Sequence, residues 1–236
     1  MKSKNAIVRA AGFLYLTIII IGVLNSIFID SKLIISKDIN LTINNITSNE
    51  FLFRFGSVCI LILYVSVIIL SVLLYLILKN VNKKLALLAM VFRMSEALIG
   101  ITTVIISFII LSLLNNQHNK ASIENAQSNI LIAAFLNART TGLYIVLLLV
   151  GIGGTLFFFL FYKSFYIPNI LSDWGMFTYL SMLALSLISL LYPDLPGIIE
   201  IIQYGAGTLF ELNIGFWFLI KGIETQKNNN NHAEIR

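Results

Sequence analysis

Six apolar segments, each long enough to cross a lipid bilayer, follow one another along this chain. We place them at 10–29, 52–78, 85–114, 130–162, 172–192 and 197–220. A spanning helix needs about 20 apolar residues, and a backbone in hydrocarbon must satisfy its own hydrogen bonds. Only 11% of the residues are charged, against roughly a quarter in soluble domains. The sequence therefore predicts an all-α polytopic membrane protein, a bundle of six transmembrane helices with the lipid bilayer as its surroundings.

The remainder of the chain consists of polar connections and ends. We expect one membrane domain over 1–224 and a disordered polar tail over 225–236, which contains four consecutive asparagines. The connections at 30–50 and 115–129 are polar, and we expect them to be solvated loops. A basic start precedes the first apolar segment, as in a signal peptide. That segment continues for about 20 residues without a cleavage motif of small residues, so we expect a retained helix.

Lysines and arginines outside the segments are unevenly distributed between the two sides of the predicted membrane. One side carries ten, in the two termini and in the connections 79–84 and 163–171. The other side carries three, Lys32, Lys37 and Lys120. The positive-inside rule then places both termini in the cytoplasm, which agrees with six spans. The formal net charge of +5 reflects this topology, and we expect no nucleic-acid binding.

Three arginines and three glutamates lie within the apolar segments, where an unpaired charge costs at least ~2.5 kcal/mol. They are Arg54, Arg93, Glu96, Arg139, Glu200 and Glu211. At ~1.5 Å of rise per helical residue, Arg93, Glu96 and Glu211 lie about 14–18 Å from the cytoplasmic helix ends, near the midplane. The other three lie near the outer boundary. We expect those three to be structural anchors, with the arginines extending toward the interface.

Helical phase places the midplane charges on stripes of small and polar residues. In the last segment Glu211 shares a face with Gly207 and Gly215, and in the third segment Glu96 shares a face with Gly100. Small residues let membrane helices approach closely. We therefore predict that the third and sixth segments are neighbours and that these three glycines lie at helix contacts. Glu211 should then approach the charges of the third segment.

The central cluster of Arg93, Glu96 and Glu211 has two interpretations. As a structural set of ion pairs, it would hold the helices in register. As a functional site, a carboxylate that is not fully compensated could exchange a proton near neutral pH or bind a small polar ligand. With all three groups ionised, the acids outnumber the base by one. This imbalance keeps the functional interpretation open.

Other kinds of site lack the residues that they need. The two histidines, His118 and His232, fall in a predicted loop and in the tail, and Cys59 is the single cysteine. We therefore expect no metal site, no disulfide within the chain and no cofactor. The glycine-rich run 151–154 lacks the complete dinucleotide-binding fingerprint and lies inside a membrane segment. We expect it to permit close helix packing or a kink instead.

Several short motifs along the chain resemble one protein family. They are Arg9 to Leu16 at the first segment, Asn49 to Arg54 at the second, Phe92 to Ala97 in the third, and Glu211 with Phe216 to Gly222 in the last. Together they resemble, nearly end to end, the bacterial membrane family known as domain of unknown function 4386. The resemblance implies a six-helix protein of the bacterial inner membrane with uncharacterised activity. It provides no catalytic residues to carry over.

The function that fits these features best is that of a non-enzymatic membrane protein whose central cluster binds a small polar ligand or a proton. A small-solute or proton-coupled transporter is the first alternative. Arg9 and Gly12 have the same spacing as Arg139 and Gly142. This short similarity is a weak indication of the internal repeat that many carriers have. An intramembrane acid-base enzyme that uses one of the midplane glutamates is the second alternative.

Overall fold

The computed structural model describes residues 2–35, 38–115, 122–192 and 197–223. Within these ranges every regular element is helical. The long helices are α1 (Lys2–Asn25), α4 (Glu50–Leu78), α5 (Lys83–Asn115), α6 (Ser122–Ser164), α7 (Asn169–Leu191) and α8 (Gly197–Ile220). Three short elements connect α1 to α4, namely η1 (Ser26–Asp30), α2 (Ser31–Leu33) and α3 (Ile39–Ser48). The predicted all-helical class is confirmed.

Five helices within the described residues are long and apolar enough to cross a membrane. They comprise α1 with its extension to Leu33, α4, α5, the part of α6 from Gln127, and α7. In α8 the described apolar stretch is Gly205–Ile220, which is shorter. Large apolar side chains such as Phe13, Phe177 and Leu209 point outward, each at least 60% exposed. An outer surface of this kind suits a lipid environment rather than water.

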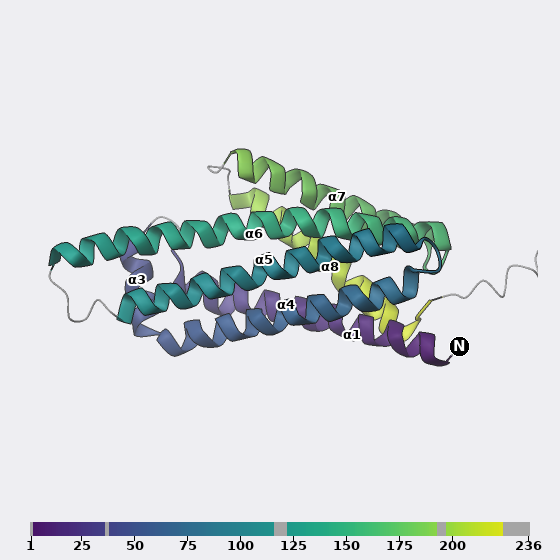
Figure 1. Ribbon diagram of the computed structural model, residues 1–236, viewed down its shortest axis with the longest axis horizontal. Helices are drawn as coiled ribbons and strands as arrows, with labels where there is room; N and C mark the ends of the chain where they lie inside the picture. The colour runs from purple at the N-terminus through teal and green to yellow at the C-terminus, as the bar shows by residue number, and fades with distance from the viewer. Residues whose placement is uncertain (1, 36–37, 116–121, 193–196, 224–236) are drawn as a thin grey trace, which may run out of the picture.

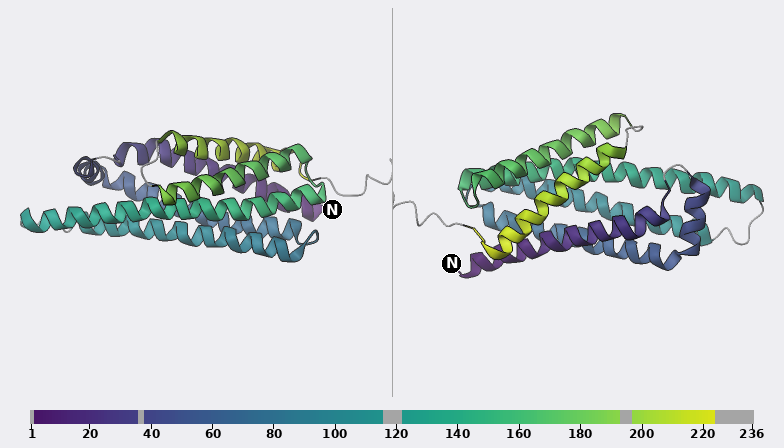
Figure 2. Two further views of the ribbon diagram at one scale, coloured as in Figure 1. Left: turned by 90° about the horizontal axis from the view of Figure 1, so that it is seen from above. Right: turned by 180° about the vertical axis from the view of Figure 1, so that it is seen from behind.

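Within the described residues the six long helices form a closed ring in chain order. Each of α1, α4, α5, α6 and α7 packs on the next long helix, and α8 packs back on α1. Figures 1 and 2 show α1, α4, α5 and α6 along the long axis, with α7 and α8 inclined to it and α8 crossing to the first half of α1. The prediction that the third and sixth segments are neighbours was wrong, because α5 packs mainly on α4 and α6. A stripe of small residues predicts a close neighbour without specifying which helix it is.

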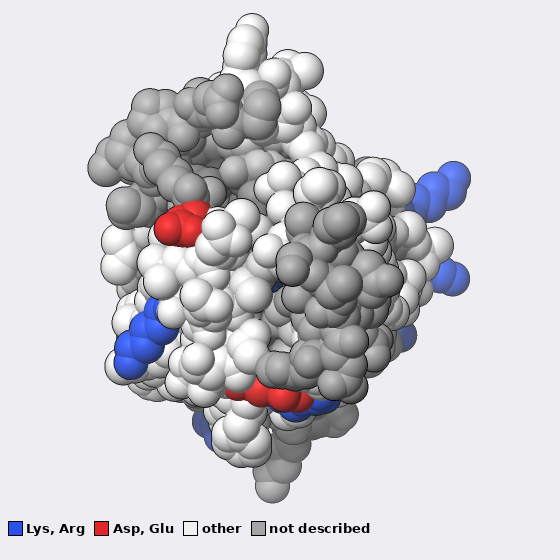
Figure 3. Space-filling view, turned by 90° about the vertical axis from the view of Figure 1, so that its left-hand side faces the viewer, with Lys and Arg blue, Asp and Glu red and all other residues white. Residues whose placement is uncertain are grey.

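The end of the ring that lies opposite the N-terminus is built around α3, and we call it the α3 end (Figure 1). Asp38 caps α3 by accepting a hydrogen bond from the Leu41 backbone N–H at 2.9 Å, and Thr42, Ile43 and Ile46 are buried. These isoleucines belong to a separate apolar cluster with residues of α4, α5 and α6. Seen end on in Figure 3, the surface here carries few charged side chains among uncharged ones.

The solvated loop predicted over 30–50 is therefore wrong for most of its length. Ile39, Ile43 and Ile46 recur at helical spacing, and a packed helix replaces the loop. In the connection predicted over 115–129, residues 116–121 lie outside the described residues, and α6 has already begun at Ser122. The tail predicted over 225–236 also lies outside the described residues. At the end of α8, Gly222 has φ +76° and its N–H donates to the Trp217 carbonyl at 3.1 Å, which terminates the helix.

Candidate functional site

Helix α5 places Arg93 and Glu96 one turn apart, and their side chains form an ion pair inside the ring. Arg93 Nη1 and Glu96 Oε2 are 2.8 Å apart, and the two side chains are 5% and 4% exposed. Glu96 Oε2 has no partner with hydrogen-bond geometry among the described residues, so the contact is a charge–charge contact. Removing one partner of a buried pair leaves the other charge uncompensated, at a cost of about 3–5 kcal/mol. The two residues therefore depend on each other.

Glycines of α6 leave room for the side chains that pack around Arg93. A Cβ at Gly153 would lie 2.9 Å from Arg93 Cγ, and a Cβ at Gly154 would lie 2.5 Å from the ring of Tyr179. At Gly151 a Cβ would lie 2.8 Å from the Tyr179 carbonyl oxygen of α7. The close packing that we predicted for the run 151–154 is thus observed. Two of these glycines lie directly against the side chains of Arg93 and Tyr179.

Glu211 of α8 forms the second part of the cluster. The Tyr179 hydroxyl of α7 donates a hydrogen bond to Glu211 Oε1 at 2.7 Å, and Glu211 is 8% exposed. Tyr15 of α1, which is 2% exposed, interacts electrostatically with Tyr179. Three helices thus contribute to one polar group, in which Tyr179 contacts Glu211 directly and Tyr15 interacts with Tyr179.

The two parts form one network in the interior of the ring. Arg93 lies within electrostatic range of Glu211, Tyr15 and Tyr179 as well as Glu96, and Glu96 interacts with Glu211. Glu211 therefore interacts electrostatically with the charges of α5. Its direct hydrogen bond, however, comes from α7 rather than across a contact between α5 and α8. We call these five residues, from α1, α5, α7 and α8, the central network.

The three glycines predicted at helix contacts lie against three different neighbours. A Cβ at Gly100 of α5 would overlap the ring of Tyr64 on α4. A Cβ at Gly207 of α8 would overlap the end of Met182 on α7, and one at Gly215 would lie 2.8 Å from Leu16 on α1. The two glycines of α8 therefore place Glu211 between α1 and α7, and not against α5.

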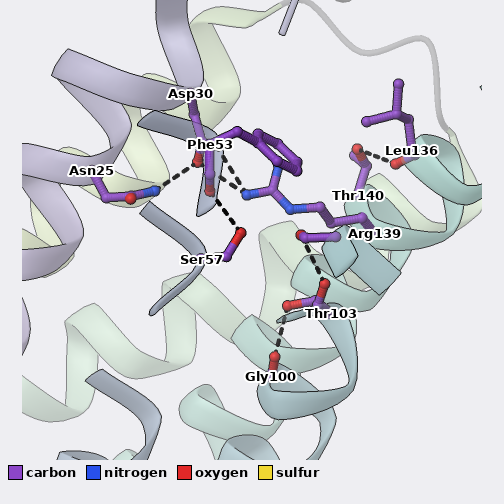
Figure 4. Close-up of polar contacts among 10 residues, drawn as sticks. Asn25, Asp30, Phe53, Ser57, Gly100, Thr103, Leu136, Arg139 and Thr140 are labelled. Atoms are coloured by element: carbon purple, nitrogen blue, oxygen red, sulfur yellow. Dashed lines mark hydrogen bonds and ion pairs between the residues drawn. The ribbon is translucent and has the colours of Figure 1, made fainter. Parts of the chain in front are cut away.

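The three charged residues predicted near the outer boundary, Arg54, Arg139 and Glu200, are arranged differently from one another. Arg54 pairs with Glu50 one turn earlier at 2.6 Å, with side chains 44% and 37% exposed. Arg139 reaches from α6 to Asp30 at the end of η1, 3.0 Å away, and its side chain is 14% exposed. In Figure 4 Asp30 lies between Asn25 and Arg139. Arg139 therefore has a partner inside the protein, where we had expected it to extend toward the interface. Glu200 lies outside the described side chains.

A family model described as a domain of unknown function, DUF4386, matches residues 10–222. This match covers most of the chain. The chain belongs to the DUF4386 family. The resemblance inferred from the four short motifs is thus confirmed. No curated protein and no solved structure matches the chain.

Sequence reasoning missed several polar partners in this DUF4386 protein. Tyr15 and Tyr179 were not chosen as site residues, although a tyrosine deep in an apolar segment usually needs a partner for its hydroxyl. Asp30 was assigned to a loop, yet it directly follows the apolar run of the first segment. Asn25, which donates to Asp30 Oδ2 at 3.1 Å, was also missed. The sequence signal in each case was a polar side chain near apolar residues.

The chemistry of the central network is that of carboxylates with one base and two phenolic hydroxyls. Such a set can hold a proton on Glu211 and can pass a proton along hydroxyl groups. Among the described residues, no group of three His, Cys, Asp or Glu side chains is placed to hold a metal ion. Cys59 is a free cysteine on α4 and does not belong to the central network.

Proposed function

We propose that this DUF4386 protein is a six-span protein of the bacterial cytoplasmic membrane that binds a proton inside its helix ring and is not an enzyme. The length of α8, 24 residues, supports it as the sixth span. A helix of this length extends about 36 Å and is long enough to cross a hydrocarbon core of about 30 Å. For cytoplasmic termini, the support is the ten-to-three bias of lysine and arginine between the two sides. Six antiparallel helices return the chain to its starting side.

The observation that carries the proposal is the environment of Glu211. This buried carboxyl group receives its direct hydrogen bond from the neutral hydroxyl of Tyr179, while Arg93 is in contact with Glu96. Two carboxylates therefore share one base in an apolar interior, where an uncompensated charge is costly. Uptake of one proton makes the central network neutral. Glu211 is the group that we expect to take it up, because it is the acid without a direct basic partner.

Infrared difference spectroscopy on the full-length protein tests this site. A protonated carboxyl group has a carbonyl band separate from that of a carboxylate, so a titration across neutral pH should show one buried carboxyl group changing state. Glu211→Gln should remove that band, and Glu50→Gln, at an exposed pair, should leave it. A parent spectrum without such a band, or one that Glu211→Gln leaves unchanged, would overturn proton binding at Glu211.

Proton-coupled transport is the second candidate. The Tyr179 hydroxyl bound to Glu211, with Tyr15 of α1 interacting with Tyr179, favours it, because polar groups on neighbouring helices can relay a proton. The test is proton flux into liposomes containing the protein, driven by a potassium diffusion potential and followed with an enclosed pH-sensitive dye. A carrier that leaks protons alone should exceed empty liposomes in rate, and Glu211→Gln should remove the excess while Glu50→Gln retains it. Equal rates in parent and empty liposomes would leave Glu211 as a proton-binding site without uncoupled flux.

A further inference from the structure

A groove of about 270 Å³ lies at the α3 end, apart from the central network. One wall comes from η1, α2 and the following Ile34, and the other comes from residues 139–144 of α6. The residues on these walls are Ser26, Ser31, Ile34, Thr140, Leu143 and Tyr144. The ion pair Asp30–Arg139 contributes to the same lining. This position gives both charges of the pair access to a solute in the groove.

The ion pair leaves binding capacity unused on both partners. Both hydrogen bonds that Arg139 donates within the described part of the chain come from Nη2, at 3.0 and 3.2 Å from the Asp30 oxygens. A guanidinium has five N–H donors, so those on Nη1 and Nε are not used in this pair. Asp30 accepts these bonds and one from Asn25, which is about three of the four that a carboxylate accepts. Each charge can therefore take a further partner without losing the present one.

Two further features distinguish this place from an ordinary ion pair. Asp30 ends η1, a π-helical turn in which the Ser31 N–H donates to the carbonyl of Ser26, and such turns are frequent at functional sites. Behind the pair lies a cavity of about 10 Å³ lined by Asn25, Asp30, Gly56 and Arg139 among others. Asn25 Oδ1 is buried there and has no hydrogen-bond partner among the described residues. The pair thus lines both the groove and a small cavity.

We propose that the groove binds a small zwitterion, a molecule with an ammonium group and an acidic group a few bonds apart. An anion alone would contact Arg139 next to the Asp30 carboxylate, and a cation alone would contact Asp30 next to the guanidinium. A zwitterion avoids both repulsions, since its acidic group contacts Arg139 while its ammonium group contacts Asp30. Ile34 and Leu143 offer apolar surface to the rest of the ligand. A free amino acid and the headgroup of an ethanolamine phospholipid both have this chemistry.

Thermal unfolding of the full-length protein in detergent tests the class of ligand and its source. Each L-amino acid with an uncharged side chain is added separately in the first arm, and glycerophosphoethanolamine forms the second arm. A ligand that binds only the folded state raises Tm as its concentration rises. Stabilisation in the first arm identifies a free amino acid, and in the second a lipid headgroup. No stabilisation in either arm overturns the proposal.

The requirement for both charges is tested with analogues of whichever zwitterion binds. Its decarboxylated and deaminated forms keep one charge each, and we expect each to bind at least about tenfold more weakly, because one charged hydrogen-bonding group is then lost. Equal affinity for either analogue would overturn the proposal. An amino acid tested this way has matched amine and acid analogues of nearly the same size.

A substitution that fills the groove keeps the test independent of the ion pair. Leu143→Trp adds bulk to the groove wall and leaves Asp30 and Arg139 in place, so we expect it to abolish ligand-induced stabilisation. Ile145→Trp is the matched control, because Ile145 lies two residues further along α6, is 37% exposed and does not line the groove. Undiminished binding by Leu143→Trp would place the ligand elsewhere and overturn the assignment. Neither result depends on Glu211.

Discussion

The central network and the Asp30–Arg139 pair are both charged centres among apolar helices, but they differ in access. In the network, Arg93 and Glu96 have side chains 5% and 4% exposed. In the outer pair, Arg139 and Asp30 have side chains 14% and 32% exposed beside a groove. Charges without access to solvent depend on protein partners alone, and only a proton is small enough to join them without rearrangement. Charges beside a groove can also contact a solute.

The largest expected difference between the two centres is the cost of removing the base. Arg93→Met should lower the free energy of unfolding by about 3–5 kcal/mol, because Glu96 is then left buried without a counter-charge. Equilibrium unfolding in mixed micelles of mild detergent and dodecyl sulfate measures this. Arg54→Met, at an exposed pair, is the control and should cost about 0–1 kcal/mol. Similar small losses in both variants would mean that the central network is hydrated.

A smaller loss should follow from removing the hydroxyl that binds Glu211. Tyr179→Phe keeps the ring packing and deletes the donor at 2.7 Å. At a pH at which Glu211 is ionised we therefore expect a loss of about 1.5–3 kcal/mol, the range for a hydrogen bond to a charged group. The same unfolding measurement applies. Tyr162→Phe, at a side chain 38% exposed, is the matched control with no expected loss. If both variants retain the parent stability, Glu211 does not depend on Tyr179.

Added volume should also distinguish the packed centre from an exposed helix surface. Gly154→Ala places a Cβ 2.5 Å from the Tyr179 ring, and overpacking of this kind costs about 1–3 kcal/mol. Gly205→Ala in α8 is the control, because no heavy atom lies within 4 Å of its Cβ, and alanine should there be neutral or stabilising by up to about 1 kcal/mol. Equal stability of the two variants would show that Tyr179 can move aside.

The smallest effect is expected at the outer pair. Asp30→Asn should reduce the free energy of unfolding by about 1 kcal/mol or less, because the pair is partly exposed. The difference from the parent should shrink as salt is added, since exposed charges are screened. A salt series of unfolding curves measures this, and the Arg93→Met difference serves as the reference that salt should change little. A large, salt-independent loss for Asp30→Asn would make the outer pair equivalent to the central network.

Part of the candidate site followed from local spacing. Arg93 and Glu96 are three residues apart on one helix, and the helical repeat alone brings such side chains together. Tyr179 and Glu211 are 32 residues apart, and Asp30 and Arg139 are 109 apart. No local rule pairs residues at these separations. This is why the candidate list contained Glu211 and Arg139 but neither of their partners.

The sequence by itself determined that the surroundings of this protein are lipid and where along the chain its long helices lie. A backbone is stable in hydrocarbon only when its hydrogen bonds are satisfied within the segment. A long apolar segment therefore predicts a helix. Only the tertiary structure decided the order of helices around the ring, because closure of α8 onto α1 depends on which small-residue surfaces fit together. That closure brings Tyr15, Tyr179 and Glu211 to Arg93. It also leaves the groove between η1 and α6, where Asp30 and Arg139 meet.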